Sequence, residues 1–527
     1  MSAADGQAHR AHTGETPVPP KIGLRDAHLH VAEFGAELSA LDVSDCASKA
    51  ACLERIAAEA ARRAEQRESS AWIVAVRARP EGWRERAWPT ANELHDAAGG
   101  RPCVVKSFDF HSLAASETAL EAAGFLPSPP RGGGHRWERS RNSDVERSND
   151  AGETSVGEGN SSVALPLPPP ARREGRQSDA HDPNRARQEV VSVQCDASAA
   201  HGRDARPTDF VADQIELDEN GRPTGLLLET MAQRVLDAMP PLTFAQQKEH
   251  VRLACDELFR RGFVEAHDMR SRPWLVKALM ELDDAGELPL RIVLHPVVED
   301  FDDVARQRDA FERESIRLGG LKVFTDGTLN SRTAWMLHPF AEPLADSPCG
   351  RRMMTDEAFV AAIKRAQAAG LPIVAHAIGD AAVRWCLDLI EAHGDRSLPH
   401  RIEHCEFVDE ADVPRFVELG VIASVQPCHL LPDIEALHRL TPHRLNRVLP
   451  LRELLDACEA AGRDAAELIW FGSDAPVVDP DPEDNAQAAV FRRRAGMSEN
   501  QAIAPEQAIS HEEAMRLMLS TKASVRS

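Results

Sequence analysis

The chain has 527 residues, 43% hydrophobic and 28% charged, enough for one large domain or several ordinary ones. Its net charge of −23 argues against nucleic acid or an anionic membrane as partner, because both attract basic surfaces. No apolar run is long enough to span a bilayer, and the N-terminus lacks the apolar core of a secretory signal. Ten scattered cysteines without a CxxC pair predict reduced thiols, so we expect a cytoplasmic protein.

Two segments are predicted to be disordered, because their composition cannot bury enough apolar area to offset chain entropy. They are the polar residues 1–20 and a low-complexity insertion, 127–208, rich in Pro, Gly, Ser, Arg and Asp. The remaining chain is predicted to divide into a first barrel strand with the first part of a cap subdomain, the second part of that cap, and the rest of a barrel. The expected boundaries are 21–126, 209–260 and 261–527.

Short apolar runs alternate with amphipathic stretches, which is typical of parallel βαβ units. Residues 355–370 have helical spacing, with apolar side chains at Phe359, Ala362, Ile363 and Ala366. Eight runs favour an α/β fold with a TIM-like (β/α)8 barrel over the alternative, a doubly wound sheet, for which no GxGxxG motif follows a strand. The runs are 23–30, 262–268, 290–298, 321–327, 371–379, 400–407, 421–427 and 468–474.

About 230 residues separate the first and second predicted strands. Outside the low-complexity insertion they contain three further apolar runs, at 71–78, 102–111 and 224–229. We expect these runs to form an inserted α/β cap subdomain between strands 1 and 2, over the mouth of the barrel.

Six polar residues lie at or near the carboxyl ends of the predicted strands. Such ends meet at one face of a barrel, where catalytic groups gather. Each residue alone has an ordinary interpretation: a core histidine, a helix cap for the aspartate, or an edge-strand lysine. Together they predict a metal centre, and in the first pair the two-residue spacing puts both imidazoles on one side of a strand. The six are His28, His30, Lys322, His376, His404 and Asp474.

The segments around these residues resemble the metal-dependent amidohydrolase superfamily. The closer likeness is to its amidohydrolase-3 branch, which includes YtcJ-like and N-substituted formamide deformylase-like hydrolases. The segments follow one another in family order from residue 24 to about residue 520, interrupted by 127–208. They are DAHLH, LKVFTDGTLNSRTA, VAHAIGDAA, RIEHCEF, SVQPCH and FGSDAPV.

The resemblance implies one or two divalent ions, with zinc as the expected metal. His28 and His30 would bind the more buried ion, and His376 and His404 the second. Lys322, carboxylated by carbon dioxide, would bridge the two, and Asp474 would both ligate and shuttle protons. Asp474 and Lys322 are therefore the expected catalytic residues. Family members usually also carry a β-sandwich, which we expect to be largely absent here, so that the barrel stands alone or packs into a homo-oligomer.

Four further residues are predicted to contact substrate: His111, Arg332, Gln426 and His429. His111, near Asp109, lies in a segment resembling the family's cap region. Arg332 is a candidate for binding a substrate carboxylate, although an ion pair within its loop is an equal alternative. Glu403 precedes His404, so strand alternation predicts that it points to the opposite side, as a structural or supporting carboxylate.

The predicted function is hydrolysis of a non-peptide C–N bond in a small-molecule amide, formamide or cyclic amide, by a metal-activated water. Two alternatives stay open at this level. One is a catalytically inactive amidohydrolase-like binding protein, and the other is a metal hydrolase that acts on esters or phosphotriesters.

Overall fold

The computed structural model describes residues 23–65, 72–107, 112–126 and 215–520. The two segments predicted to be disordered, 1–20 and 127–208, lie outside these ranges, and so does His111. No helix in the described ranges is both long enough and apolar enough to cross a membrane.

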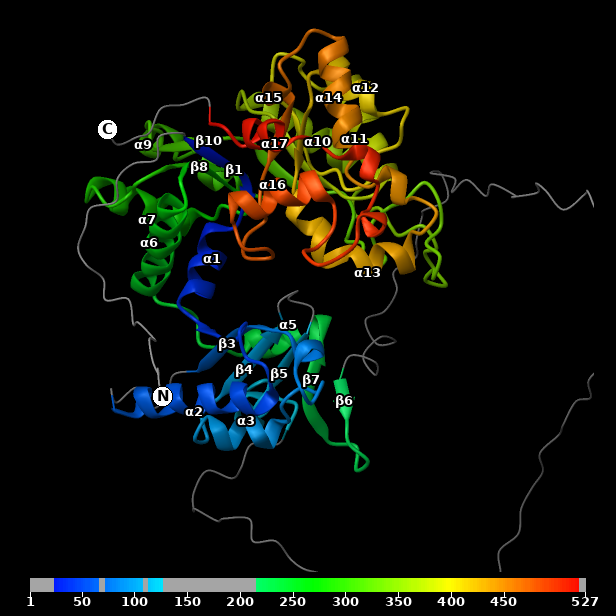
Figure 1. The fold of residues 1–527 in the computed structure, drawn as a ribbon. Helices are drawn as coiled ribbons and strands as arrows, with labels where there is room; N and C mark the ends of the chain where they lie inside the picture. The colour runs from blue at the N-terminus through cyan, green and yellow to red at the C-terminus, as the bar shows by residue number, and fades with distance from the viewer. Residues whose placement is uncertain (1–22, 66–71, 108–111, 127–214, 521–527) are drawn as a thin grey trace, which may run out of the picture. The chain divides into compact units, whose positions relative to one another are not determined.

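Nine parallel strands form two sheets (Figure 1). The four-stranded sheet has the order β1-β8-β9-β10, and the five-stranded sheet runs β11-β12-β13-β14-β15. The first consists of β1 (Leu24–Leu29), β8 (Phe263–Asp268), β9 (Arg291–Leu294) and β10 (Ile316–Leu318). The second consists of β11 (Leu321–Phe324), β12 (Ile373–Ala377), β13 (Arg401–His404), β14 (Ile422–Val425) and β15 (Ile469–Phe471).

Two isolated parallel bridges join these sheets at their edges. Leu29 in β1 pairs with Ala475 just after β15, and Val297 after β9 pairs with Lys322 in β11. The described strands therefore form parallel sheets linked on two sides, but they do not pair as one closed ring. All eight predicted strands are present, and a TIM-like barrel is consistent with them. The three-residue β10 was not predicted.

Helices follow the strands along the chain and bury one face in a common apolar core. In the helix predicted over residues 355–370, the Thr355 side chain caps the N-terminus by accepting a hydrogen bond from Ala358 N. The four apolar side chains predicted for this helix are buried. The helices are α1 (Val31–Leu38), α6 (Phe244–Arg260), α7 (Pro273–Asp284), α8 (Phe301–Ala305), α9 (Arg308–Phe311), α10 (Asp356–Ala368), α11 (Asp380–His393), α12 (Val413–Leu419), α13 (Leu430–Leu440), α14 (Leu451–Ala460), α15 (Ala465–Leu468), α16 (Pro482–Phe491) and α17 (His511–Leu517).

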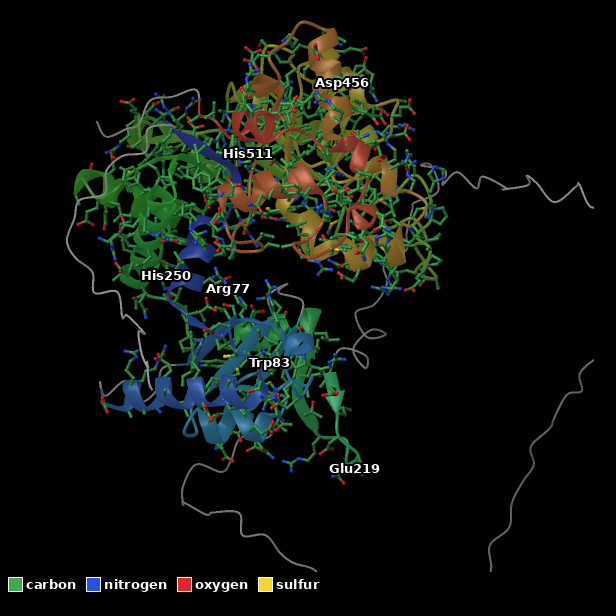
Figure 2. All side chains as sticks on the ribbon, viewed as in Figure 1. Arg77, Trp83, Glu219, His250, Asp456 and His511 are labelled. Atoms are coloured by element: carbon green, nitrogen blue, oxygen red, sulfur yellow. The ribbon has the colours of Figure 1, made fainter. Side chains whose placement is uncertain are left out.

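Residues between β1 and β8 form a separate mixed sheet of order β2-β3-β4-β5-β7-β6. Successive side chains of its strands enter two different apolar clusters, as expected for alternation across a sheet. Trp83, labelled in Figure 2, is buried in one cluster. The elements are β2 (Leu41–Asp42), β3 (Ile73–Ala78), β4 (Cys103–Ser107), β5 (Ser112–Ala115), β6 (Ile215–Leu217), β7 (Pro223–Leu228), α2 (Lys49–Glu65), α3 (Ala91–Ala97), α4 (Glu117–Ala122) and α5 (Glu229–Asp237).

The three apolar runs predicted in this region correspond to β3, β4 and β7. The role of the sheet as a cap, and the domain boundaries, remain predictions. The described residues form three sheets, with no β-sandwich among them.

The expectation of reduced thiols holds at eight described cysteines, which are free and buried. It is wrong at Cys349, which is disulfide-bonded.

Candidate active site

Five of the six predicted metal ligands line one cavity of about 320 Å³, a volume suited to a small molecule. His28 lies in β1, and His30 immediately follows that strand. His376 lies in β12, His404 ends β13, and Asp474 follows β15. The strands therefore deliver their polar ends to one place, as the sequence predicted.

The shortest contacts among these side chains involve Asp474. Its Oδ1 atom lies 3.4 Å from His28 Nε2 and 3.2 Å from His30 Nε2. The ligand atoms of these three residues lie within 4.8 Å of one another. The His404 ring lies between two others, with centroid distances of 4.8 Å to His28 and 4.4 Å to His376. Such a set of imidazoles and one carboxylate suits zinc or a similar divalent ion.

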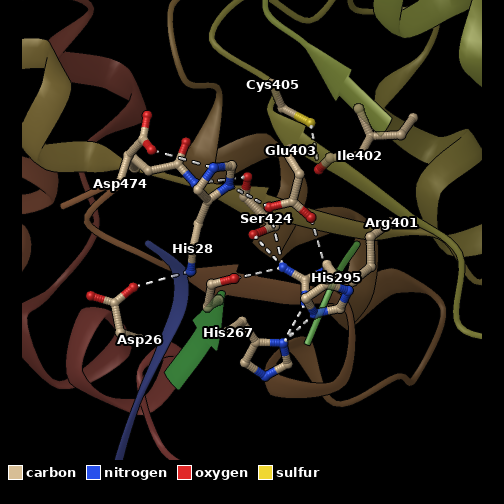
Figure 3. A network of polar contacts seen from close by, with 12 residues as sticks. Asp26, His28, His267, His295, Arg401, Ile402, Glu403, Cys405, Ser424 and Asp474 are labelled. Carbon is tan, nitrogen blue, oxygen red and sulfur yellow. Dashed lines mark hydrogen bonds and ion pairs between the residues drawn. The ribbon is translucent and has the colours of Figure 1, made fainter. Parts of the chain in front are cut away.

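His28 is oriented by a buried carboxylate beneath the cavity. Its Nδ1 donates to Glu403 Oε2 at 2.8 Å, which turns Nε2 toward Asp474. Figure 3 shows Glu403 between His28 and Arg401, whose Nε donates to Glu403 Oε1 at 2.9 Å. Burial alone would raise the pKa of Glu403, but the Arg401 and His28 contacts hold it well below its usual range. The carboxylate is therefore ionised and holds one tautomer of His28.

Glu403 thus supports the site, as expected, but it does not point away from it. The prediction from strand alternation is wrong because His404 has a φ of 72°, which ends the extended backbone at that residue. Both Glu403 and the His404 ring contact His28.

Lys322 is the sixth predicted ligand and lies beside the other five. Its side chain is 1% exposed, and its Nζ has no hydrogen-bond partner among the described residues. Burial lowers the pKa of Lys322 to about 8, and its charge in turn lowers the pKa values of His28, His376 and His404. A buried amine without a partner is not the solvated lysine of an exposed sheet edge. Burial shifts the Lys322 amine toward the neutral form that carboxylation requires.

The buried histidines are held neutral. Burial lowers the pKa of His28 to about 4 and that of His376 to about 3. Burial also takes the pKa of His404 well below its usual value, and its Nδ1 has no hydrogen-bond partner among the described residues. Neutral imidazoles with a free ring nitrogen are the state that metal binding needs.

Asp474 remains an anion despite its burial. Desolvation would raise its pKa, but His28 and His30 hold the pKa of this carboxyl well below its usual range. Its alternative role as a helix cap is excluded, because the next helix, α16, is capped by Asp481. The Asp474 Oδ1 atom faces the Nε2 atoms of both His28 and His30, where an ion held by the two imidazoles would also meet the carboxylate. It is therefore available to a metal ion or to a proton.

The predicted substrate contacts are only partly brought together. His429 lines the cavity, with Nε2 3.2 Å from the Ser473 carbonyl. Gln426 is buried nearby but is not among the lining residues. Arg332 does not reach the cavity, because its loop turns it toward the Glu342 carbonyl, 3.4 Å from Nη1. The contact is with a backbone carbonyl, so it is neither the ion pair nor the carboxylate recognition weighed for Arg332.

Sequence reasoning missed two buried aspartates that hold the strand ends. Asp26 accepts from His28 N at 3.0 Å and from Ser473 Oγ at 2.6 Å, joining β1 to the segment after β15. Asp326 accepts three backbone N–H groups, including those of Ile378 and Gly379 at 3.1 and 2.9 Å. Both lie inside quoted motifs, DAHLH and TDG, so their positions were visible, but their partners are distant in sequence.

Sequence reasoning also missed polar residues of the cavity wall, among them Asn330, Glu406 and Asp433. Asn330 Nδ2 donates to Asp433 Oδ1 at 2.8 Å. Glu406 lies two residues after His404, with Oε1 3.9 Å from His429 Nδ1. Only the folded arrangement of the loop after β11, the end of β13 and α13 puts the three together.

Two known proteins resemble this chain, one over most of its length and the other over about half of it. YtcJ of Bacillus subtilis (strain 168) is 24% identical over 488 residues, covering 89% of this chain and 73% of YtcJ. Protein LONG AFTER FAR-RED 3 of Arabidopsis thaliana is 29% identical over 292 residues, covering 52% of this chain and 48% of that protein.

Solved structures show the same fold. An uncharacterized metal-dependent hydrolase from Pyrococcus horikoshii OT3 matches with a TM-score of 0.61 at 20% identity, covering 94% of this chain and 78% of that one. A second, from Pyrococcus furiosus, has a TM-score of 0.60 at 21% identity, covering 94% and 80%. A model of the Amidohydrolase family matches residues 23–152 and 185–525, and this match over most of the sequence shows that the chain belongs to the amidohydrolase family.

Proposed function

We propose that this chain is a metal-dependent hydrolase that cleaves a non-peptide C–N bond in a small-molecule amide, formamide or cyclic amide. The observation that carries the proposal is the convergence of His28, His30 and Asp474 within 4.8 Å of one another in a cavity of about 320 Å³. Membership of the amidohydrolase family supports a hydrolase.

The residues present fit a divalent ion. Two buried polar atoms without a hydrogen-bond partner in the described chain, Lys322 Nζ and His404 Nδ1, would be costly unless a ligand satisfied them. His28, His30 and Asp474 would hold one ion, and His376 and His404 a second. We propose zinc as the metal and a carbamate on Lys322 as the bridge, formed when the neutral amine adds to carbon dioxide and loses a proton.

Each side chain then has a chemical task. When bound, the ion acts as a Lewis acid that polarises the scissile carbonyl and brings the pKa of water down to about 7. Asp474 accepts the proton of the attacking water and returns it to the leaving amine nitrogen as the C–N bond breaks. Glu403 keeps His28 in the tautomer whose Nε2 faces Asp474.

The test combines metal analysis with a substrate panel. The purified protein should contain one or two divalent ions per chain, and chelation should abolish hydrolysis of N-formyl and N-acyl amines until metal is restored. Asp474→Asn should lower turnover about 10²- to 10⁴-fold. Asp456→Asn is the matched control, because the Asp456 side chain lies on the surface (61% exposed; Figure 2).

Two outcomes would overturn the proposal. One is a protein that binds no metal and keeps full turnover with Asn at position 474. The other is a panel in which matched esters or phosphotriesters are hydrolysed and no amide is.

A further inference from the structure

A second group of potential metal ligands lies in the same cavity as Asp474. His404, Glu406 and His429 each offer one ligand atom, and these atoms lie within 4.8 Å of one another. The group gathers at the carboxyl ends of two paired parallel strands, because His404 ends β13, Glu406 follows closely, and His429 comes soon after β14. Two imidazoles and one carboxylate are a ligand set that zinc sites use.

The His429 ring is oriented by a backbone carbonyl. Its Nε2 lies 3.2 Å from the Ser473 oxygen, which can only accept, so in the neutral ring Nε2 carries the proton and Nδ1 keeps its lone pair. That Nδ1 lies 3.9 Å from Glu406 Oε1. The separation is too long for a hydrogen bond, but an ion about 2.0–2.2 Å from each ligand atom fits between them.

The other two members are buried without matching partners. His404 is 4% exposed, and its Nδ1 has no hydrogen-bond partner in the described chain. The Glu406 side chain is 12% exposed, and among the described residues no lysine or arginine lies within ion-pair distance of it. Burial and the neighbouring Asp433 raise the pKa of Glu406, and a bound cation would offset both effects.

The Asp474 carboxylate lies between this group and the first one. Its Oδ1 atom faces His28 and His30, at 3.4 and 3.2 Å from their Nε2 atoms. Its Oδ2 atom lies 4.0 Å from His429 Nε2. Ions bound at the two groups would therefore be neighbours of one carboxylate, close enough to act on one substrate.

We propose that the ion held by His404 also takes Glu406 and His429 as ligands, and that it is a divalent ion of the zinc type. The inference rests on the proposed function in one respect, since it assumes a divalent ion at His404. The second ion then draws its ligands from the ends of three successive strands, β12, β13 and β14. This gives His429 a role other than the substrate contact predicted from the sequence.

Zinc titration of the metal-free protein against a competing chelator tests the ligand set. The wild type should bind two zinc ions per chain. Glu406→Gln and His429→Gln should each weaken one of the two by at least about 100-fold, because losing an outer partner of a ligand already costs about 10- to 100-fold. Asp433→Asn is the matched control, since Asp433 is an acidic residue of the same cavity outside the ligand group, and it should keep both ions.

Nitrogen NMR of the wild-type histidine rings tests the same site without any substitution, so its outcome does not depend on how a variant folds. The Nδ1 resonance of His429, assigned from the spectrum of His429→Gln, should shift on zinc saturation as that nitrogen becomes a ligand. The resonances of His511 should stay in place, because this ring is 53% exposed and pairs with Glu483.

The results separate this inference from the proposed function. Two zinc ions bound at wild-type affinity in both Glu406→Gln and His429→Gln, or a His429 resonance that zinc does not move, would overturn the inference even if amides are hydrolysed. A protein that loses one zinc in both variants but hydrolyses esters and no amide would support the inference and refute the proposed function.

Discussion

Single backbone torsions aim the side chains at the centre of the site. His404, Cys405 and Asp474 have φ values of 72°, 45° and 59°, in the left-handed region that costs a non-glycine residue about 1–2 kcal/mol. Backbone hydrogen bonds hold them there: Cys405 N donates to Ala377 O at 3.0 Å, and Asp474 N donates to His28 O at 2.6 Å. Two of the six predicted ligands therefore occupy strained positions, which is typical of functional sites.

The Glu403 carboxylate gives the sharpest prediction for a single residue. Glu403→Gln should weaken metal binding about 10- to 100-fold, because the amide is a poorer acceptor for the His28 Nδ1–H. Metal titration with a competing chelator measures the affinity, and ¹⁵N NMR of the histidine ring nitrogens reports the tautomer of His28.

Glu265→Gln is the control for Glu403→Gln. Glu265 is also buried and paired with an arginine, Arg291 at 3.0 Å, but it makes no contact with a predicted ligand. It should lower stability without changing the His28 tautomer. Unchanged metal affinity and an unchanged tautomer in Glu403→Gln would refute the positioning role.

At the scale of elements, the site depends on how closely β15 approaches β1. A Cβ atom on Gly472 would lie 2.5 Å from His28 N, a backbone atom that cannot move aside cheaply. Gly472→Ala should destabilise the protein by roughly 1–3 kcal/mol or more, as overpacking does, and should also weaken metal binding because His28 is displaced.

Thermal unfolding and metal titration together test this Gly472 contact. Gly82→Ala is the control, since a Cβ there meets nothing within 4 Å. A Gly472→Ala protein with wild-type stability and metal affinity would show that the two strands do not need this contact.

The elements also show what the sequence could and could not predict. Apolar runs ending in His28, His376, His404 and Asp474 identified the strands and their polar ends, because parallel strands buried on both faces are continuously apolar. The three-residue β10 is too short for such a signal. The polar part of the cavity wall formed by Asn330, Glu406 and Asp433 was not predictable, since these residues lie after β11, after β13 and in α13 and meet only in the fold.

The position of Arg332 was likewise beyond sequence reasoning. Its loop folds back on itself, with Gly327 N donating to Thr333 O at 3.2 Å and Arg332 N to Leu329 O at 2.9 Å. Local hydrogen bonds of this kind, rather than distance along the chain from a strand end, decide where a loop side chain points.

For the whole molecule, a buried polar network beneath the site links both sheets. His267, in β8, accepts from Arg401 Nη1 at 2.8 Å and lies 3.0 Å from His295 Nε2 (Figure 3). Burial lowers the pKa of His267 to about 4, compared with about 6.5 in the unfolded chain. The folded state therefore binds fewer protons at this residue than the unfolded state does.

The pH dependence follows from that difference. The contribution of His267 to stability is complete above pH 6.5 and is lost as the pH falls toward 4. The free energy of unfolding of the wild type, relative to that of His267→Gln, should therefore fall by about 2 kcal/mol between pH 6.5 and pH 5. Urea unfolding of the chelator-treated wild type and His267→Gln at both pH values measures this difference in unfolding free energy. A difference that stays constant or rises on acidification would contradict a buried neutral His267.

The central claim is that the polar ends of separate strands share one metal centre. Anomalous diffraction at the zinc edge from crystals of the metal-loaded protein tests it most directly. The account predicts one or two peaks within coordinating distance of the His28, His30 and Asp474 side chains, next to His376 and His404. Peaks only at other sites, or no peak at full zinc saturation, would contradict it.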